Sequence, residues 1–132
     1  AIIKDLVKDI NELKNNGIET VAIMSNDTKN YPEDSFVNML SFSNINRFNF
    51  PYLFDEKQEV AKKFGAVCTP DFFGYNKSLR LQYRGRFREL RELTPVKNGE
   101  SELKSAMMMI SKTQNGPKEQ IPSMGCNIKW IN

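Results

Sequence analysis

VCTPDFFGYN, residues 67–76, places a cysteine two positions before a proline and then runs into an aromatic segment. DFFGYN, residues 71–76, and LRLQYRGR, residues 79–86, have the composition of β-strands, and residues 76–78 between them are typical of a tight turn. The sequence therefore predicts a β-hairpin. Cys68, immediately ahead of it, is either part of a redox site or a small buried residue beside a turn.

Helices and strands alternate on the N-terminal side of this hairpin, as shown by apolar spacing and by glycine stops. The segment 18–25 has an almost continuous apolar centre, which predicts a strand covered on both faces. The order indicates a single α/β domain over residues 1–132. The expected elements are a helix over 1–17, a strand over 18–25, a helix over 31–46, a short strand over 50–55, a helix over 56–65, the hairpin, a helix over 100–116 and a tail over 117–132.

The composition is that of an ordinary globular protein and excludes several kinds of site. The chain has 132 residues, of which 39% are hydrophobic, and no apolar run approaches the roughly 18 residues of a membrane span. The absence of histidine from the sequence excludes Ser-His-Asp and Cys-His nucleophiles and His-based zinc motifs. Two cysteines, Cys68 and Cys126, are too few for a four-ligand structural zinc site. We therefore expect no metal, no cofactor and no membrane partner.

Positive charge is concentrated at one place, the second strand of the hairpin and the residues after it. A net charge of +3 is otherwise spread over segments of mixed sign. Alternating arginines at a strand end are more typical of a solvated edge than of a nucleic-acid groove, so we expect no nucleic-acid partner. The residues concerned are Arg80, Arg84, Arg86, Arg88 and Arg91.

Five strings resemble, in this order and spacing, the peroxiredoxin-like members of the thioredoxin family, also grouped as redoxin or AhpC/TSA proteins. The resemblance covers essentially the whole chain, and it implies a thioredoxin-like fold in which Pro70 follows a cis peptide bond and faces the active site. It also implies a thiol-dependent oxidoreductase that reduces a peroxide or a protein disulfide and is recycled by a thiol electron donor. The strings are YPEDS, FPYLFDE, VAKKFGAVCTPDFF, LQYRGRF and PSMGCNIKW.

One feature of the family has no counterpart here. Relatives carry a central strand and a Cys-Pro-aromatic motif ahead of their first long helix, and nothing of this kind stands before Ala1. We therefore expect the chain to be the downstream part of a longer protein, with its attacking cysteine upstream. The family's central strand lies between the strand over 18–25 and the strand over 71–76, so its absence would leave two unpaired sheet edges. The alternative is a short protein that closes its sheet as a homodimer through these edges.

The two cysteines have a functional and a structural interpretation each. Cys68 is either a thiol near the active-site mouth or a small apolar residue packed under a turn. Cys126 is either an accessible resolving thiol or a buried anchor beside Trp130. Whether Cys68 and Cys126 form a disulfide is left open, because the sequence alone does not show whether their Cα atoms lie within the ~7 Å that a disulfide requires.

Three residues next to Cys68 complete the candidate site. The backbone of Thr69 beside Pro70 offers an edge to which an extended substrate can pair. Asp71 orients the loop, tunes a neighbouring thiol or caps the turn. A function of another class is a non-catalytic binding module that docks a partner polypeptide at the Pro70 edge. We expect a cytoplasmic protein, because the sequence shows no signal peptide.

Overall fold

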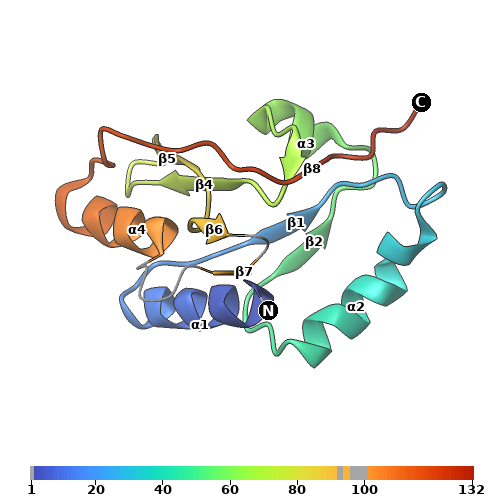
Figure 1. Ribbon diagram of the computed structural model, residues 1–132, viewed down its shortest axis with the longest axis horizontal. Helices are drawn as coiled ribbons and strands as arrows, with labels where there is room; N and C mark the ends of the chain where they lie inside the picture. The colour runs from blue at the N-terminus through green and yellow to red at the C-terminus, as the bar shows by residue number, and fades with distance from the viewer. Residues whose placement is uncertain (1, 92–93, 96–100) are drawn as a thin grey trace.

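The computed structural model describes residues 2–91, 94–95 and 101–132, and Figure 1 shows their arrangement. The described elements alternate between helix and strand as expected for an α/β domain. They are α1 (Ile2–Asn15), β1 (Ala22–Met24), the 3-10 helix η1 (Pro32–Asp34), α2 (Phe36–Ile45), β2 (Tyr52–Phe54), α3 (Glu59–Phe64), β3 (Cys68–Thr69), β4 (Phe72–Tyr75), β5 (Leu81–Gly85), β6 (Leu90–Arg91), β7 (Thr94–Pro95), α4 (Glu102–Thr113) and β8 (Cys126–Asn127).

The core lies where α4 packs against the hairpin strands β4 and β5, with α1 beside α4. Helix α1 buries one apolar stripe and ends at Asn15, and the predicted glycine stop follows at Gly17, whose φ of 79° suits a glycine. Helix α4 starts at Ser101, whose hydroxyl accepts from the amide of Lys104. It ends one turn before the predicted Gly116 stop, because Gln114 takes the left-handed conformation instead. The buried core residues are Tyr83, Phe87, Leu103, Ala106 and Ile110.

The predicted hairpin is confirmed, with a longer turn than expected. Strands β4 and β5 are antiparallel, and their register shifts between Gly74 and Tyr75. The turn is closed by Asn76, whose side-chain oxygen accepts from the amides of Ser78 and Arg80. The second strand therefore begins at Leu81 rather than at residue 79, because residues 77–80 are used by this wider turn.

The parallel pair β1 and β2 differs from the sequence prediction in length and in burial. Strand β1 covers three residues rather than the whole of 18–25, and Val21 and Ile23 are 54% and 41% exposed. The expectation of two covered faces was wrong, because Val21 and Ile23 lie on the same face and both are exposed. Within the described ranges, β1 has only β2 as a strand partner. Strand β4 likewise pairs only with β5 among these residues, so β1 and β4 each keep one free edge, as the resemblance implied.

The helix predicted over 31–46 is divided in two. Residues 32–34 form the 3-10 turn η1, and Ser35 then starts α2 by accepting from the amide of Asn38. A proline and two acids favour the first turn of a helix, and here they form a separate turn of their own. Several apolar side chains of α2 are exposed, among them Val37 and Ile45.

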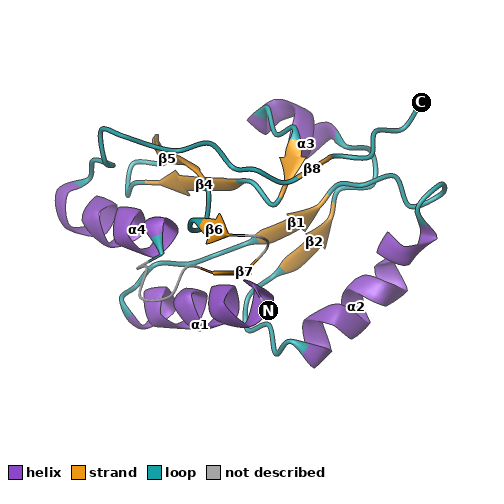
Figure 2. Ribbon diagram, viewed as in Figure 1, coloured by secondary structure: helices purple, strands orange, loops and turns teal. Residues whose placement is uncertain are grey.

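The segment predicted as a plain tail contains the strand β8. Figure 2 shows residues 117–132 as a loop that passes along β5 and reaches β3 and α3. Strand β8 pairs antiparallel with β3, far away in the sequence. We call residues 117–132 the strap.

Tyr83 provides a test of the core. Its ring is 2% exposed, its hydroxyl donates to the carbonyl of Arg86 at 2.6 Å, and burial followed by the charge of Glu102 raises its pKa to about 12. An unfolded tyrosine titrates near pH 10, so the folded state holds the extra proton between pH 10 and 12 and its stability falls as pH rises through this window. We expect urea unfolding to show this fall in the wild type and a smaller one in Tyr83→Phe. Equal slopes in both proteins would contradict the assignment.

Candidate functional site

The structure brings four of the five predicted site residues together at β3. The peptide bond between Thr69 and Pro70 is cis, as the resemblance implied. Strand β8 pairs with β3 so that Thr69 faces Cys126 and Cys68 faces Asn127. Cys126 therefore lies beside Pro70 although it is 57 residues away from Thr69 in the sequence (126 against 69).

The two thiols are free, and they differ in accessibility. Residues that face each other across an antiparallel pair share one side of it, so Cys126 lies on the side of Thr69 and Cys68 on the opposite side. This register explains why the disulfide that the sequence left open is not formed. Cys68 is half-buried and its thiol donates to the carbonyl of Ser123 at 3.8 Å, whereas Cys126 is exposed.

The interpretation of Cys126 as a buried anchor was wrong. Ile128, two residues later, is 4% exposed and fixes this part of the strap in the core. Trp130 lies at the surface, with the ammonium group of Lys62 5.9 Å from its ring centre. An anchor two residues farther along leaves the thiol of Cys126 free to face solvent.

Asp71 acts in the structure as the ion-pair partner of Arg84. The two side chains approach to 3.4 Å, and Arg84 also donates to the carbonyl of Gly65 at 2.7 Å and lies over the ring of Phe73. Asp71 therefore fixes the start of the hairpin to the end of α3. Of the roles that the sequence left open for Asp71, this arrangement supports orientation of the loop.

The first half of the strap is bound to the edge of β5. Gln120 accepts from the amide of Arg84 and donates to the carbonyl of Gln82, at 2.9 and 2.8 Å. The carbonyl of Ile121 then accepts from the amide of Arg86, and the hydroxyl of Ser123 donates to the carbonyl of Gly85. The strap thus follows β5 along its length before it reaches β3.

The second half of the strap is bound to the carboxyl ends of β1 and β2 through Gln58. This side chain is 1% exposed, and its amide nitrogen donates to the carbonyls of Ser25 and Lys129, at 2.7 and 2.9 Å. Its amide oxygen accepts from the backbone of Ile131 at 2.9 Å. Asp27 adds a backbone bond from its own amide to the carbonyl of Lys129 at 2.8 Å. Gln58 could not be singled out from the sequence, because a polar residue between a strand and a helix is common and does not indicate a buried side chain.

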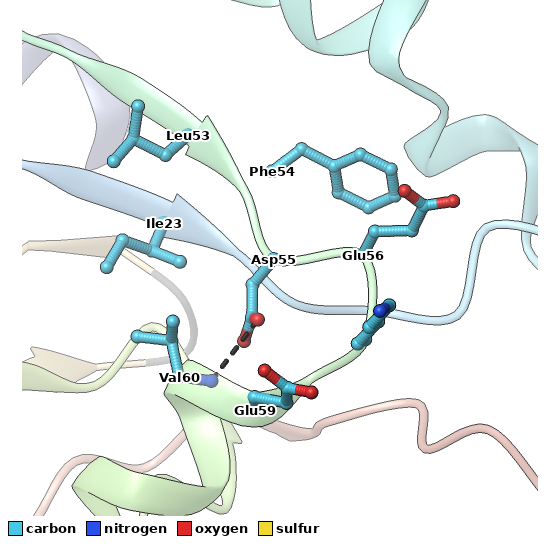
Figure 3. A pocket seen from close by; sticks show the side chains of 8 residues that line it. Ile23, Leu53, Phe54, Asp55, Glu56, Glu59 and Val60 are labelled. Carbon is cyan, nitrogen blue, oxygen red and sulfur yellow. Dashed lines mark hydrogen bonds between the residues drawn. The ribbon is translucent and has the colours of Figure 1, made fainter.

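Asp55 organises the same corner by capping α3. Its carboxylate accepts from the amides of Val60 and Ala61 and from the hydroxyl of Ser25. Burial would raise the pKa of Asp55, and these hydrogen bonds together lower it. Asp55 also lines a hollow of about 330 Å³ together with Ile23, Leu53 and Val60. Figure 3 shows these side chains. Neither cysteine lines this hollow, so we do not place the thiol chemistry there.

The predicted cluster of arginines is largely neutralised by acids. Arg86 makes two hydrogen bonds to Glu102, at 2.6 and 2.7 Å, and Arg88 lies 3.8 Å from both Asp5 and Asp9. Burial raises the pKa of Asp9. The side chain of Arg91 lies outside the described residues. These pairings agree with a structural use of the charges.

The described residues form neither a cluster of metal ligands nor a helix that could span a membrane. Among the described residues, no three His, Cys, Asp or Glu side chains come together as metal ligands. In the same part of the chain, no helix has both the length and the apolar character needed to span a membrane.

Comparison with known proteins identifies the family. The sequence model of the AhpC/TSA family matches residues 1–88. The chain belongs to the AhpC/TSA family. Its fold is α/β and thioredoxin-like, as the strings in the sequence had indicated.

Two solved structures of AhpC/TSA-like fold superpose closely on the chain. A hypothetical protein from Sinorhizobium meliloti 1021 is 37% identical with a TM-score of 0.89, and the match covers 98% of this chain and 71% of that one. An uncharacterized conserved protein from Geobacillus kaustophilus is 38% identical with a TM-score of 0.92, and the match covers 98% of this chain and 69% of that one. A search of curated proteins finds no match.

The first prediction for the site concerns the two thiols. We expect iodoacetamide to alkylate Cys126 at least about tenfold faster than Cys68, because only Cys126 is exposed and the thiol of Cys68 is bonded to the strap. Peptide mass spectrometry after timed quenching measures both rates in one sample. Faster alkylation of Cys68 would contradict this placement of the strap.

The second prediction concerns Gln58→Glu. A glutamate there loses the two donated hydrogen bonds and, when ionised, faces two carbonyl oxygens, so its folded pKa is raised above the ordinary ~4.3. The variant should be nearly as stable as the wild type below pH 4 and lose stability as pH rises through the raised pKa, by about 1–3 kcal/mol at pH 8. Urea unfolding at both pH values measures this. Equal stability of Gln58→Glu relative to the wild type at both pH values would refute the role of Gln58.

Proposed function

We propose that this chain belongs to a thiol-dependent oxidoreductase that reduces a peroxide or a disulfide. The observation that carries the proposal is the pairing of β3 with β8, which puts an exposed cysteine, Cys126, beside the cis bond at Pro70 in a member of the AhpC/TSA family. The attacking cysteine is a third one, ahead of α1, as the resemblance implies. Cys126 is the resolving thiol, and Cys68 is a neighbour covered by the strap.

The proposed reaction uses two thiols in succession. A thiolate attacks one peroxide oxygen, so that an S–O bond forms, the O–O bond breaks, and the alcohol or water leaves after taking up a proton. The sulfenic acid then condenses with the thiol of Cys126, which forms an S–S bond and releases water. Two external thiol groups, from one dithiol or from two monothiols, then supply two electrons through a mixed disulfide, restore both cysteines and end as a disulfide themselves. A disulfide substrate follows the same course through a mixed disulfide.

Exposure and position favour Cys126 over Cys68 for the second step. A resolving thiol must reach a partner sulfur outside its own strand, and only Cys126 faces solvent. The thiol of Cys68 points to the other side of the strand pair and is bonded to Ser123. The strap thereby separates the two cysteines in role as well as in direction.

The test starts with the source DNA ahead of the codon for Ala1. We expect an open frame that encodes an apolar strand and a Cys-Pro motif. In the protein expressed from that frame, Cys126→Ser should still form the first sulfenic acid, trapped with dimedone, while peroxide turnover with dithiothreitol falls about tenfold. Cys68→Ser, the matched control, should change turnover less than about twofold.

Two outcomes would overturn the proposal. A stop codon directly ahead of Ala1 would remove the expected attacking cysteine. Unchanged turnover in the double variant Cys68→Ser and Cys126→Ser, in a protein with no other cysteine, would exclude thiol catalysis altogether.

A further inference from the structure

The edge of β3 is a place where an extended polypeptide can bind as a strand. An exposed strand edge presents unpaired N–H and C=O groups, and peptides add to such edges through main-chain hydrogen bonds. In the described ranges, β3 pairs with β8 alone, so the edge of β3 that faces the strap is occupied by residues of the same chain. A polypeptide that binds to this edge as a strand must first displace the strap.

Gly125 makes the contact at this edge too close for any other residue. A Cβ at this position would overlap the carbonyl oxygen and carbon of Thr69 and lie 3.1 Å from the nitrogen of Pro70. The next residues continue the pairing, and the amide of Ile128 donates to the carbonyl of Val67 at 3.1 Å. The edge therefore accepts a segment with glycine at this one position.

Anchors on both sides hold the segment in place. Ahead of the segment in the sequence, the side chains of Gln120 and Ser123 bind β5. At its other end, the side chain of Ile128 is buried, and the amide of Ile131 donates to Gln58. A tethered segment competes with a free one at an effective concentration of about 1 mM or above. A free polypeptide present at micromolar concentration is thus at a large disadvantage.

We propose that residues 125–128 are a blocking strand that keeps other polypeptides off the edge of β3 beside Pro70. For the thiol site this selects small hydroperoxides over protein disulfides, a consequence that rests on the proposed function. Protein disulfides present an extended chain that must lie along the active-site edge, and here that edge is filled. A small hydroperoxide needs no strand pairing, so the blocking strand does not keep it from the thiol site.

The test is peptide binding to the full 132-residue chain. The probe is a fluorescein-labelled peptide with the sequence of residues 121–131, carrying Ser in place of the cysteine to exclude thiol exchange. The wild type should show no saturable binding in the micromolar range, and Gly125→Val should bind at least about tenfold more tightly because its own segment no longer fits. Met124→Val, at a position 88% exposed, is the matched control and should behave as the wild type.

A second peptide with valine at the position of Gly125 checks the register and should not bind to any of the three proteins. Binding of the first peptide to the wild type as tightly as to Gly125→Val would overturn the proposal. A second outcome would also overturn it. If iodoacetamide alkylates Cys68 faster in Gly125→Val than in the wild type, the strap has been released. If this variant still does not bind the first peptide, the edge of β3 does not accept a strand.

Hydrogen exchange on the wild type tests the same point without a variant. The amide of Ile128 should be protected, because it is bonded to Val67 inside the strand pair. The amide of Ala61, which donates to the carboxylate of Asp55, is the internal control and should also be protected. If the amide of Ile128 exchanges as fast as in an unfolded peptide while that of Ala61 is protected, the strap does not pair with β3, and the proposal is contradicted. None of these measurements depends on thiol turnover, so they can fail or succeed separately from the proposed function.

Discussion

The side-chain amide of Gln58 joins its own loop to two other stretches of backbone. It binds the ends of β1 and of the strap through their carbonyls, and the amide of Ile131 completes its hydrogen bonding. A buried amide left without partners costs about 1–3 kcal/mol, so these stretches are held in one arrangement rather than several. The position of β8 on β3, and with it the place of Cys126, depends on this junction and on the anchors along β5.

Local signals in the sequence were sufficient for most elements. Apolar spacing and a glycine stop predicted α1, and Gly65 marked the end of α3. The exposure of Ile23 could not be predicted, because an apolar strand does not reveal how many of its edges and faces have partners. Ser35 split the predicted helix over 31–46, since a good N-cap residue competes with helix continuation.

At the candidate site, sequence reasoning did not predict how the candidate residues lie relative to one another. The resemblance implied the cis bond at Pro70, and the exposure of Cys126 agrees with one of the two interpretations that the sequence left open. The opposite directions of the two thiols follow from the register of β3 and β8, which only the tertiary structure fixes. Gly125 carried a signal in retrospect, since a glycine inside a segment that pairs with a strand often marks a close backbone approach. The ion pair of Asp71 with Arg84 across the hairpin was not predicted from the sequence.

The sequence distance between β3 and its partner has a consequence for biosynthesis. Thr69 is translated 57 residues before Cys126 (126 against 69), which at about 5–20 residues per second leaves roughly 3–11 seconds between them. During this interval the nascent chain carries β3 without the strand that covers it. The new protein is thus most open to incorrect strand pairing, and most in need of a chaperone, before the strap leaves the ribosome.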